Sequence, residues 1–100
     1  MAQVFVQSAI KSGPVVLFTK GYCPYCKEAL ALFDRMKVSY KNVDIENNPQ
    51  MDAIQDYLKE ITGARSVPRV FIGGKFIGGC DDTKALHAAG KLQDLVSSAQ

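Results

Sequence analysis

Apolar residues recur along this chain at two spacings, and these spacings predict helices and strands in alternation. A loosely helical pattern runs from about Gln3 to Lys11. The next apolar block, residues 15–18, is short, continuous and rich in valine, which is typical of a strand buried on both faces. A longer helical pattern begins at Pro24, and its apolar positions are Cys26, Leu30, Phe33 and Met36.

The middle of the chain predicts a second strand and a third helix. Val43 and Ile45 alternate around a polar residue, which favours a strand over residues 39–45. A helix should open after Pro49 and close at Gly63. Its apolar stripe consists of Met51, Ile54, Leu58 and Ile61.

The last third of the chain predicts a hairpin followed by two helices. Apolar residues in 68–72 and 76–77 flank a glycine-rich turn, which favours two antiparallel strands. Asp81 or Asp82 is the expected N-cap of the next helix. Gly90 should end that helix, and a short terminal helix follows it.

The order of the elements is therefore α-β-α-β-α-β-β-α-α, which predicts an α/β fold. Two strands joined by a helix should be parallel, with a right-handed crossover. The hairpin adds an antiparallel pair to the same sheet, and helices should cover both faces. With 100 residues and no visible repeat or linker, residues 1–100 are expected to form a single domain.

Composition and charge exclude several classes of partner. The chain is 47% hydrophobic and 22% charged, as in ordinary globular proteins. A net charge of +2 is too small to indicate nucleic acid, and no apolar run is long enough to cross a membrane. The N-terminus lacks the basic start and long apolar stretch of a secretory signal. We therefore expect a cytoplasmic protein with no nucleic-acid or membrane partner.

The cysteines carry the candidate chemistry. Because the chain has 3 cysteines, one would be left over from any ordinary disulfide framework. In a reducing compartment, two cysteines separated by two residues are more often catalytic or metal-binding than structural. Pro24 suits the first position of a helix, so Cys23 should be the N-cap and Cys26 should lie one turn inside.

That placement gives the two thiols different chemistry. The free N–H groups and the dipole at a helix N-terminus favour a thiolate, so the pKa of Cys23 should fall below the free value of roughly 8.5. Lys20 places a cation nearby. Cys26 should be more buried and less acidic. We therefore expect Cys23 to attack a disulfide and Cys26 to resolve the mixed disulfide that forms.

A structural zinc site is the alternative for this pair of cysteines. Zinc requires four ligands, and the only other candidates are Cys80 and His87, on one short segment. The redox interpretation is therefore favoured, and no metal is expected.

Three segments resemble the glutaredoxin family. Residues 23–26, Cys-Pro-Tyr-Cys, are similar to the active site of the dithiol members. Residues 62–68, Thr-Gly-Ala-Arg-Ser-Val-Pro, resemble the family's Thr-Val-Pro segment, with Ser66 in place of threonine. Residues 78–82, Gly-Gly-Cys-Asp-Asp, resemble its Gly-Gly-x-Asp segment. The resemblance implies a thioredoxin fold, with a four-stranded mixed sheet flanked by helices, and a glutathione site beside the first cysteine.

The resemblance also implies the contacts of that glutathione. The Val67 backbone should pair with the cysteine part of the ligand, with a cis peptide bond before Pro68. A helix N-terminus suits the γ-glutamyl carboxylate, Asp81 can take the ammonium group, and Gly79 allows a close approach of the backbone. Lys20, Gln55 and Arg65 match the glycine-carboxylate end. The implied glutathione-binding residues are Lys20, Tyr25, Gln55, Arg65, Val67, Pro68, Gly79, Cys80, Asp81 and Asp82.

Simpler interpretations stay open for some of these residues. Asp81 would look the same if it served only as a helix cap, and Gln55 if it faced water. Arg69 is interpreted as a solvated surface charge. Cys80 either modulates the reactivity of the site or forms a disulfide under oxidation, or it is a small residue that fills the turn.

The function that the resemblance implies is reduction of glutathione mixed disulfides and of protein disulfides. Glutathione would be the co-substrate, the partners would be glutathionylated or disulfide-containing proteins, and the protein would act as a monomer. The alternative is an iron–sulfur cluster carrier, in which Cys23 and glutathione from two subunits are the ligands. Pro24 stiffens the turn after Cys23 and argues against the carrier.

Overall fold

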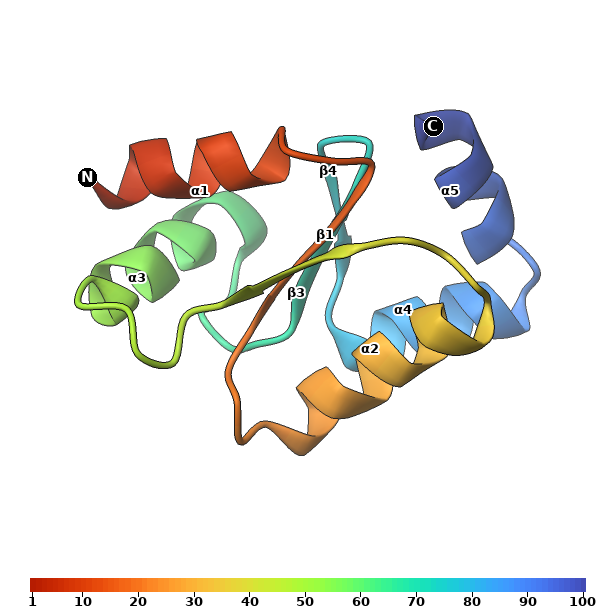
Figure 1. The fold of residues 1–100 in the computed structure, drawn as a ribbon, viewed down its shortest axis with the longest axis horizontal. Helices are drawn as coiled ribbons and strands as arrows, with labels where there is room; N and C mark the ends of the chain where they lie inside the picture. The colour runs from red at the N-terminus through yellow and green to blue at the C-terminus, as the bar shows by residue number, and fades with distance from the viewer.

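A single mixed sheet organises the chain, and its strand order is β2-β1-β3-β4 (Figure 1). The computed structural model describes residues 1–100. The central strand β1 (Val15–Thr19) pairs in parallel with β2 (Lys41–Asp44) and antiparallel with β3 (Arg69–Ile72). The outer strand β4 (Lys75–Gly78) pairs antiparallel with β3. The predicted parallel pair and the predicted hairpin are both confirmed.

Five helices cover the two faces of this sheet. On one face, α1 and α3 pack against each other, whereas α2, α4 and α5 cover the other face (Figure 1). None of the helices has the length and apolar character that crossing a membrane requires. Their bounds are α1 Ala2–Ile10, α2 Pro24–Arg35, α3 Met51–Thr62, α4 Cys80–Ala88 and α5 Leu92–Ala99.

A hydrophobic core lies on each face of the sheet, and strand β1 is buried along its whole length because it supplies side chains to both. Val15 and Leu17 pack with α2 and α5 on one face of the sheet. Val16 and Phe18 pack with α1 and α3 on the opposite face. Successive residues of a strand point to opposite faces, so a continuous apolar run is what this central position requires.

Two predicted boundaries are wrong. The second strand covers only Lys41–Asp44 and is largely exposed, because it lies at the edge of the sheet. Helix α4 has Gly79 as its N-cap, and neither Asp81 nor Asp82 caps it. The chain leaves β4 in extended conformation and enters the helix at Cys80, so both carboxylates fall in the first turn. In that turn they interact favourably with the helix dipole.

Gly78, at the junction of β4 and α4, should be the glycine least tolerant of substitution. Its φ is +137°, and a Cβ there would collide with the Asp82 side chain, whose carboxylate Oδ2 would be 2.6 Å away. We expect Gly78→Ala to lower the free energy of unfolding by about 1–3 kcal/mol or more, through backbone strain and overpacking. Urea denaturation measures this loss. Gly13→Ala is the control, since a Cβ at Gly13 meets nothing within 4 Å, and equal losses in the two variants would contradict the prediction.

Candidate active site

Cys23 is the N-cap of α2, as the sequence predicts. The residue has an extended backbone, and Pro24 follows it in the first turn of the helix. The Cys26 backbone N–H donates a hydrogen bond to the Cys23 Sγ at 3.2 Å. This donor and the positive end of the helix dipole stabilise negative charge on the sulfur. Cys23 is only partly buried, so its sulfur combines stabilisation of charge with access for a reactant.

Cys26, in the first turn of α2, differs from Cys23 in burial and acidity. It is 2.9 Å from Cys23, and both residues are free thiols. With only 1% of its surface exposed, burial raises the pKa of Cys26 to about 12, and a hydrogen bond with Cys23 contributes to the shift. A backbone hydrogen bond from Lys20 opposes it. The predicted asymmetry, an accessible first thiol and a buried, weakly acidic second one, is confirmed.

The Val67 backbone reaches the same sulfur from a distant part of the chain. The Cys23 thiol donates to the Val67 carbonyl oxygen at 3.5 Å. The peptide bond between Val67 and Pro68 is cis, as expected from the Val-Pro segment. The loop before β3 therefore forms one wall of the site around Cys23.

An open cavity of about 470 Å³ adjoins this wall. Small-molecule sites typically have volumes of about 300–1,000 Å³, so the cavity is large enough for such a ligand. It brings together residues from the start of α2, the loop before β3 and the first turn of α4. Its lining consists of Tyr25, Ser66, Val67, Pro68, Arg69, Gly79, Cys80, Asp81 and Asp82.

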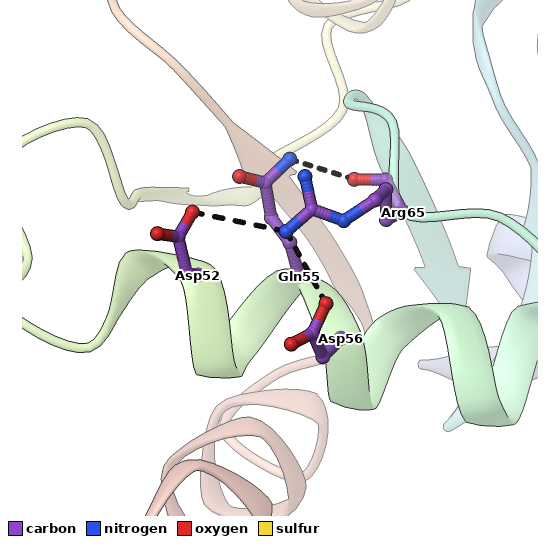
Figure 2. Close-up of polar contacts among 4 residues, drawn as sticks. All are labelled: Asp52, Gln55, Asp56 and Arg65. Atoms are coloured by element: carbon purple, nitrogen blue, oxygen red, sulfur yellow. Dashed lines mark hydrogen bonds and ion pairs between the residues drawn. The ribbon is translucent and has the colours of Figure 1, made fainter.

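The other predicted binding residues, Lys20, Gln55 and Arg65, are not part of the cavity lining. Gln55 is buried on α3, and its side-chain amide donates to the Arg65 carbonyl oxygen at 2.8 Å (Figure 2). The interpretation of Gln55 as a residue facing water is therefore wrong. Arg65 directly precedes Ser66 of the cavity lining, and its guanidinium pairs with Asp52 and Asp56 of α3. Lys20, which follows β1, takes part in none of the chain's ion pairs.

Ser66 and Arg69 line the cavity but were not among the predicted binding residues, and Arg69 was interpreted as a surface charge. Arg69 is partly buried, and its guanidinium donates to the Pro68 carbonyl oxygen at 3.2 Å and lies 5.1 Å from the centre of the Phe76 ring. A Cβ at Gly79 would be 3.0 Å from its Nη2. Burial lowers the pKa of Arg69, and the Asp82 carboxylate opposes this shift. Its position directly after the Val-Pro pair was the only sequence signal.

Cys80 lies in the wall of the cavity, at the first position of α4, and is only 5% exposed. Burial raises the pKa of its thiol, and the Glu28 carboxylate raises it further. A buried, protonated thiol of this kind fills space more readily than it reacts. The geometry favours the interpretation of Cys80 as a residue that fills the turn.

The zinc hypothesis has no ligand set in this structure. The chain contains no group of three or more histidine, cysteine, aspartate or glutamate residues that could hold a metal ion.

Comparisons with known proteins agree on one family. The family model described as Glutaredoxin matches residues 15–77. The chain is 44% identical to a glutaredoxin of Ricinus communis, over 99% of this chain and 97% of that protein. It is 45% identical to glutaredoxin-1 of Homo sapiens, over 92% and 90% of the two chains. The crystal structure of a buckwheat glutaredoxin–glutathione complex is similar with a TM-score of 0.96 at 41% identity, covering 99% of this chain and 90% of that one.

Selective alkylation should distinguish the three cysteines. At pH 7 a small excess of iodoacetamide should modify Cys23 first, because Cys26 and Cys80 are buried and have raised pKa values. Peptide mass mapping over a time course identifies the modified residue. In urea all three should react at similar rates, which is the control. Modification of Cys80 as fast as that of Cys23 in the folded protein would show that the wall of the cavity is open to solvent.

The raised pKa of Cys26 should also make stability depend on pH. Above pH 9 the unfolded chain loses the Cys26 proton while the folded protein keeps it until about pH 12, so folding becomes less favourable as pH rises. The slope is at most about 1.4 kcal/mol per pH unit. Urea denaturation of the reduced protein between pH 8 and pH 11 should therefore show the wild type losing stability relative to Cys26→Ser. Parallel pH curves for the two proteins would contradict the assignment.

Proposed function

The chain belongs to the glutaredoxin family, whose members are glutathione-dependent oxidoreductases, and we propose that it reduces glutathione mixed disulfides with Cys23 as the nucleophile. One observation carries this assignment. The Sγ of Cys23 accepts the Cys26 N–H at the start of α2, and its contact with the Val67 carbonyl oxygen places it against a residue of the cavity wall. A nucleophilic sulfur beside a ligand-sized cavity is the arrangement that attack on a bound disulfide requires.

We propose that glutathione occupies this cavity and extends from it toward α3. The complex of the buckwheat relative with glutathione supports the ligand. The first turn of α4 offers free N–H groups for the γ-glutamyl carboxylate and Asp81 for the ammonium group. The Val67 backbone already lies against the sulfur, where the cysteine part of the ligand must be.

The glycine carboxylate then faces the segment that precedes the cavity wall. Arg65 and Lys20 supply the positive charge there. Gln55 acts indirectly, because its amide already holds the Arg65 carbonyl oxygen. Tyr25 forms the rim beside Cys23 and is 59% exposed, so it can cover a bound ligand without closing the site.

The reaction on a mixed disulfide consists of two exchanges. The Cys23 thiolate attacks the glutathione sulfur, a Cys23–glutathione disulfide forms, and the substrate leaves as a thiolate that takes up a proton. The thiolate of a second glutathione then attacks the bound glutathione sulfur, which yields oxidised glutathione and releases the Cys23 thiolate. Glutaredoxin potentials of about −200 to −230 mV are close to the cytosolic glutathione poise, so glutathione is an adequate electron donor.

Cys26 is required only when the substrate is a disulfide within one protein. Attack by Cys23 then leaves the substrate bound through a mixed disulfide, and Cys26 displaces it by forming a Cys23–Cys26 disulfide, which two glutathiones reduce. Once Cys23 is in a disulfide it carries no negative charge, so the charge of Cys23 no longer raises the pKa of Cys26. Burial, the largest cause of the raised pKa of Cys26, still acts at that step.

Three further properties are part of the proposal. We propose that the protein acts as a monomer. The substrates we propose are glutathionylated and disulfide-containing proteins, because Cys23 is only partly buried and contacts Val67 of the cavity wall. Three free cysteines support a reducing compartment such as the cytoplasm. The comparisons do not favour the iron–sulfur alternative.

Substitution of each cysteine should separate the two branches of the mechanism. Cys23→Ser should reduce turnover of a glutathione mixed disulfide to the uncatalysed rate, because no other accessible thiol is present. Cys26→Ser should keep turnover within about tenfold of the wild type, a barrier change of about 1.4 kcal/mol. The same variant should lose reduction of a disulfide within one protein. An assay coupled to glutathione reductase measures the first activity, and insulin reduction measures the second.

Cys80→Ser tests whether the third thiol reacts, since Cys80 lies in the cavity wall but the mechanism uses no sulfur there. It should retain both activities. Full activity of Cys23→Ser would refute the assignment of the nucleophile.

A further inference from the structure

Helix α3 presents three side chains to the segment that carries Arg65 (Figure 2). Asp52 and Asp56 are four residues apart and therefore lie on one face of the helix, one turn from each other. Gln55 lies between them and donates to the Arg65 carbonyl oxygen. The hydrogen bond from Gln55 holds the backbone of Arg65, and the carboxylates of Asp52 and Asp56 face its guanidinium.

Both carboxylates pair with the same nitrogen of Arg65. The Nη2 atom is 3.3 Å from an oxygen of Asp56 and 3.7 Å from an oxygen of Asp52 (Figure 2). The guanidinium makes no other hydrogen bond to a side chain, so its Nη1 and Nε groups are free to bind an anion from outside. One cation is thus shared by two carboxylates before any ligand arrives.

These ion pairs contribute little to the position of Arg65. The side chains of Asp52 and Asp56 are 86% and 73% exposed, and ion pairs between exposed side chains contribute little to stability. The buried amide of Gln55 already holds the backbone. The two carboxylates nevertheless repel an anion that approaches Arg65. Salt does not screen this repulsion fully, because they lie closer to the guanidinium than the Debye length of about 10 Å at 0.1 M salt.

We propose that Asp52 and Asp56 are internal competitors for Arg65, which weaken its attraction for the glycine carboxylate of glutathione. The inference rests on the proposed function, since it concerns the affinity of that same site. When the ligand carboxylate reaches Arg65, three carboxylates surround one guanidinium and repel one another. The site therefore distinguishes glutathione from thiols that lack this carboxylate less strongly than Arg65 alone would.

The test isolates the first exchange reaction in the Cys26→Ser background. The rate of Cys23 glutathionylation is followed by mass spectrometry with two reagents, oxidised glutathione and its analogue in which both glycine carboxylates are amides. Asp56→Asn and Asp52→Asn should each raise the second-order rate constant for oxidised glutathione about two- to fivefold. Neither substitution should change the rate constant for the amide analogue.

Three controls separate local competition from other effects. Asp94→Asn makes the same change of charge on α5, at the far end of the molecule from α3 (Figure 1), and should have no effect. Arg65→Gln should abolish the gain from Asp56→Asn. In 1 M salt, where the Debye length is about 3 Å, the gain should shrink.

The outcomes are distinct. A lower rate constant in the aspartate variants would overturn the inference and show that the carboxylates orient Arg65 for binding. Equal gains for both reagents, or an equal gain in Asp94→Asn, would overturn it as well. Failure of the wild-type Cys23 to accept glutathione at all would instead refute the proposed function, and the inference with it.

Discussion

The burial of β1 on both faces is the constraint on which the rest of the structure depends. Its valine, leucine and phenylalanine side chains supply the centre of two cores, and its backbone pairs with a neighbour on each side. A strand held in this way ends at a defined point, Thr19, and the helix that follows begins within a few residues of that point. The position of Cys23 in space is therefore set by the most buried element of the protein.

The site combines Cys23, whose position β1 determines, with segments that are distant in sequence. The loop before β3 reaches Cys23 because β3 is paired to β1, which places Val67 against the sulfur. The first turn of α4 reaches the same cavity because the hairpin continues directly into the helix. An exposed ion pair between Lys84 and Glu28, at 3.0 Å, connects α4 to α2 across the sequence. The sheet thus assembles the site, and surface contacts add little to its stability.

Charge within the site is arranged by burial and by pairing. Burial keeps the proton on Cys26 and Cys80, so that Cys23 is the thiol available for reaction. Arg69 is held against Phe76 and the Pro68 carbonyl oxygen, which fixes a positive charge in the wall of the cavity. Arg65 directly precedes the cavity lining in the chain, and two carboxylates of α3 share its charge. The strength with which the site holds an anion is therefore a balance between cations and neighbouring carboxylates.

The sequence by itself determined the order of the elements, the position of Cys23 as N-cap and the family resemblance. These features follow from local rules, because hydrophobic spacing, proline at the first helical position and short motifs involve residues close in the chain. Only the tertiary structure decided the burial of Gln55, the role of Arg69 and the pairing of Arg65 with Asp52 and Asp56. It also moved the start of α4 to Cys80. Each of these depends on which elements pack together, and contacts between side chains distant in sequence leave no periodic signal in a single chain.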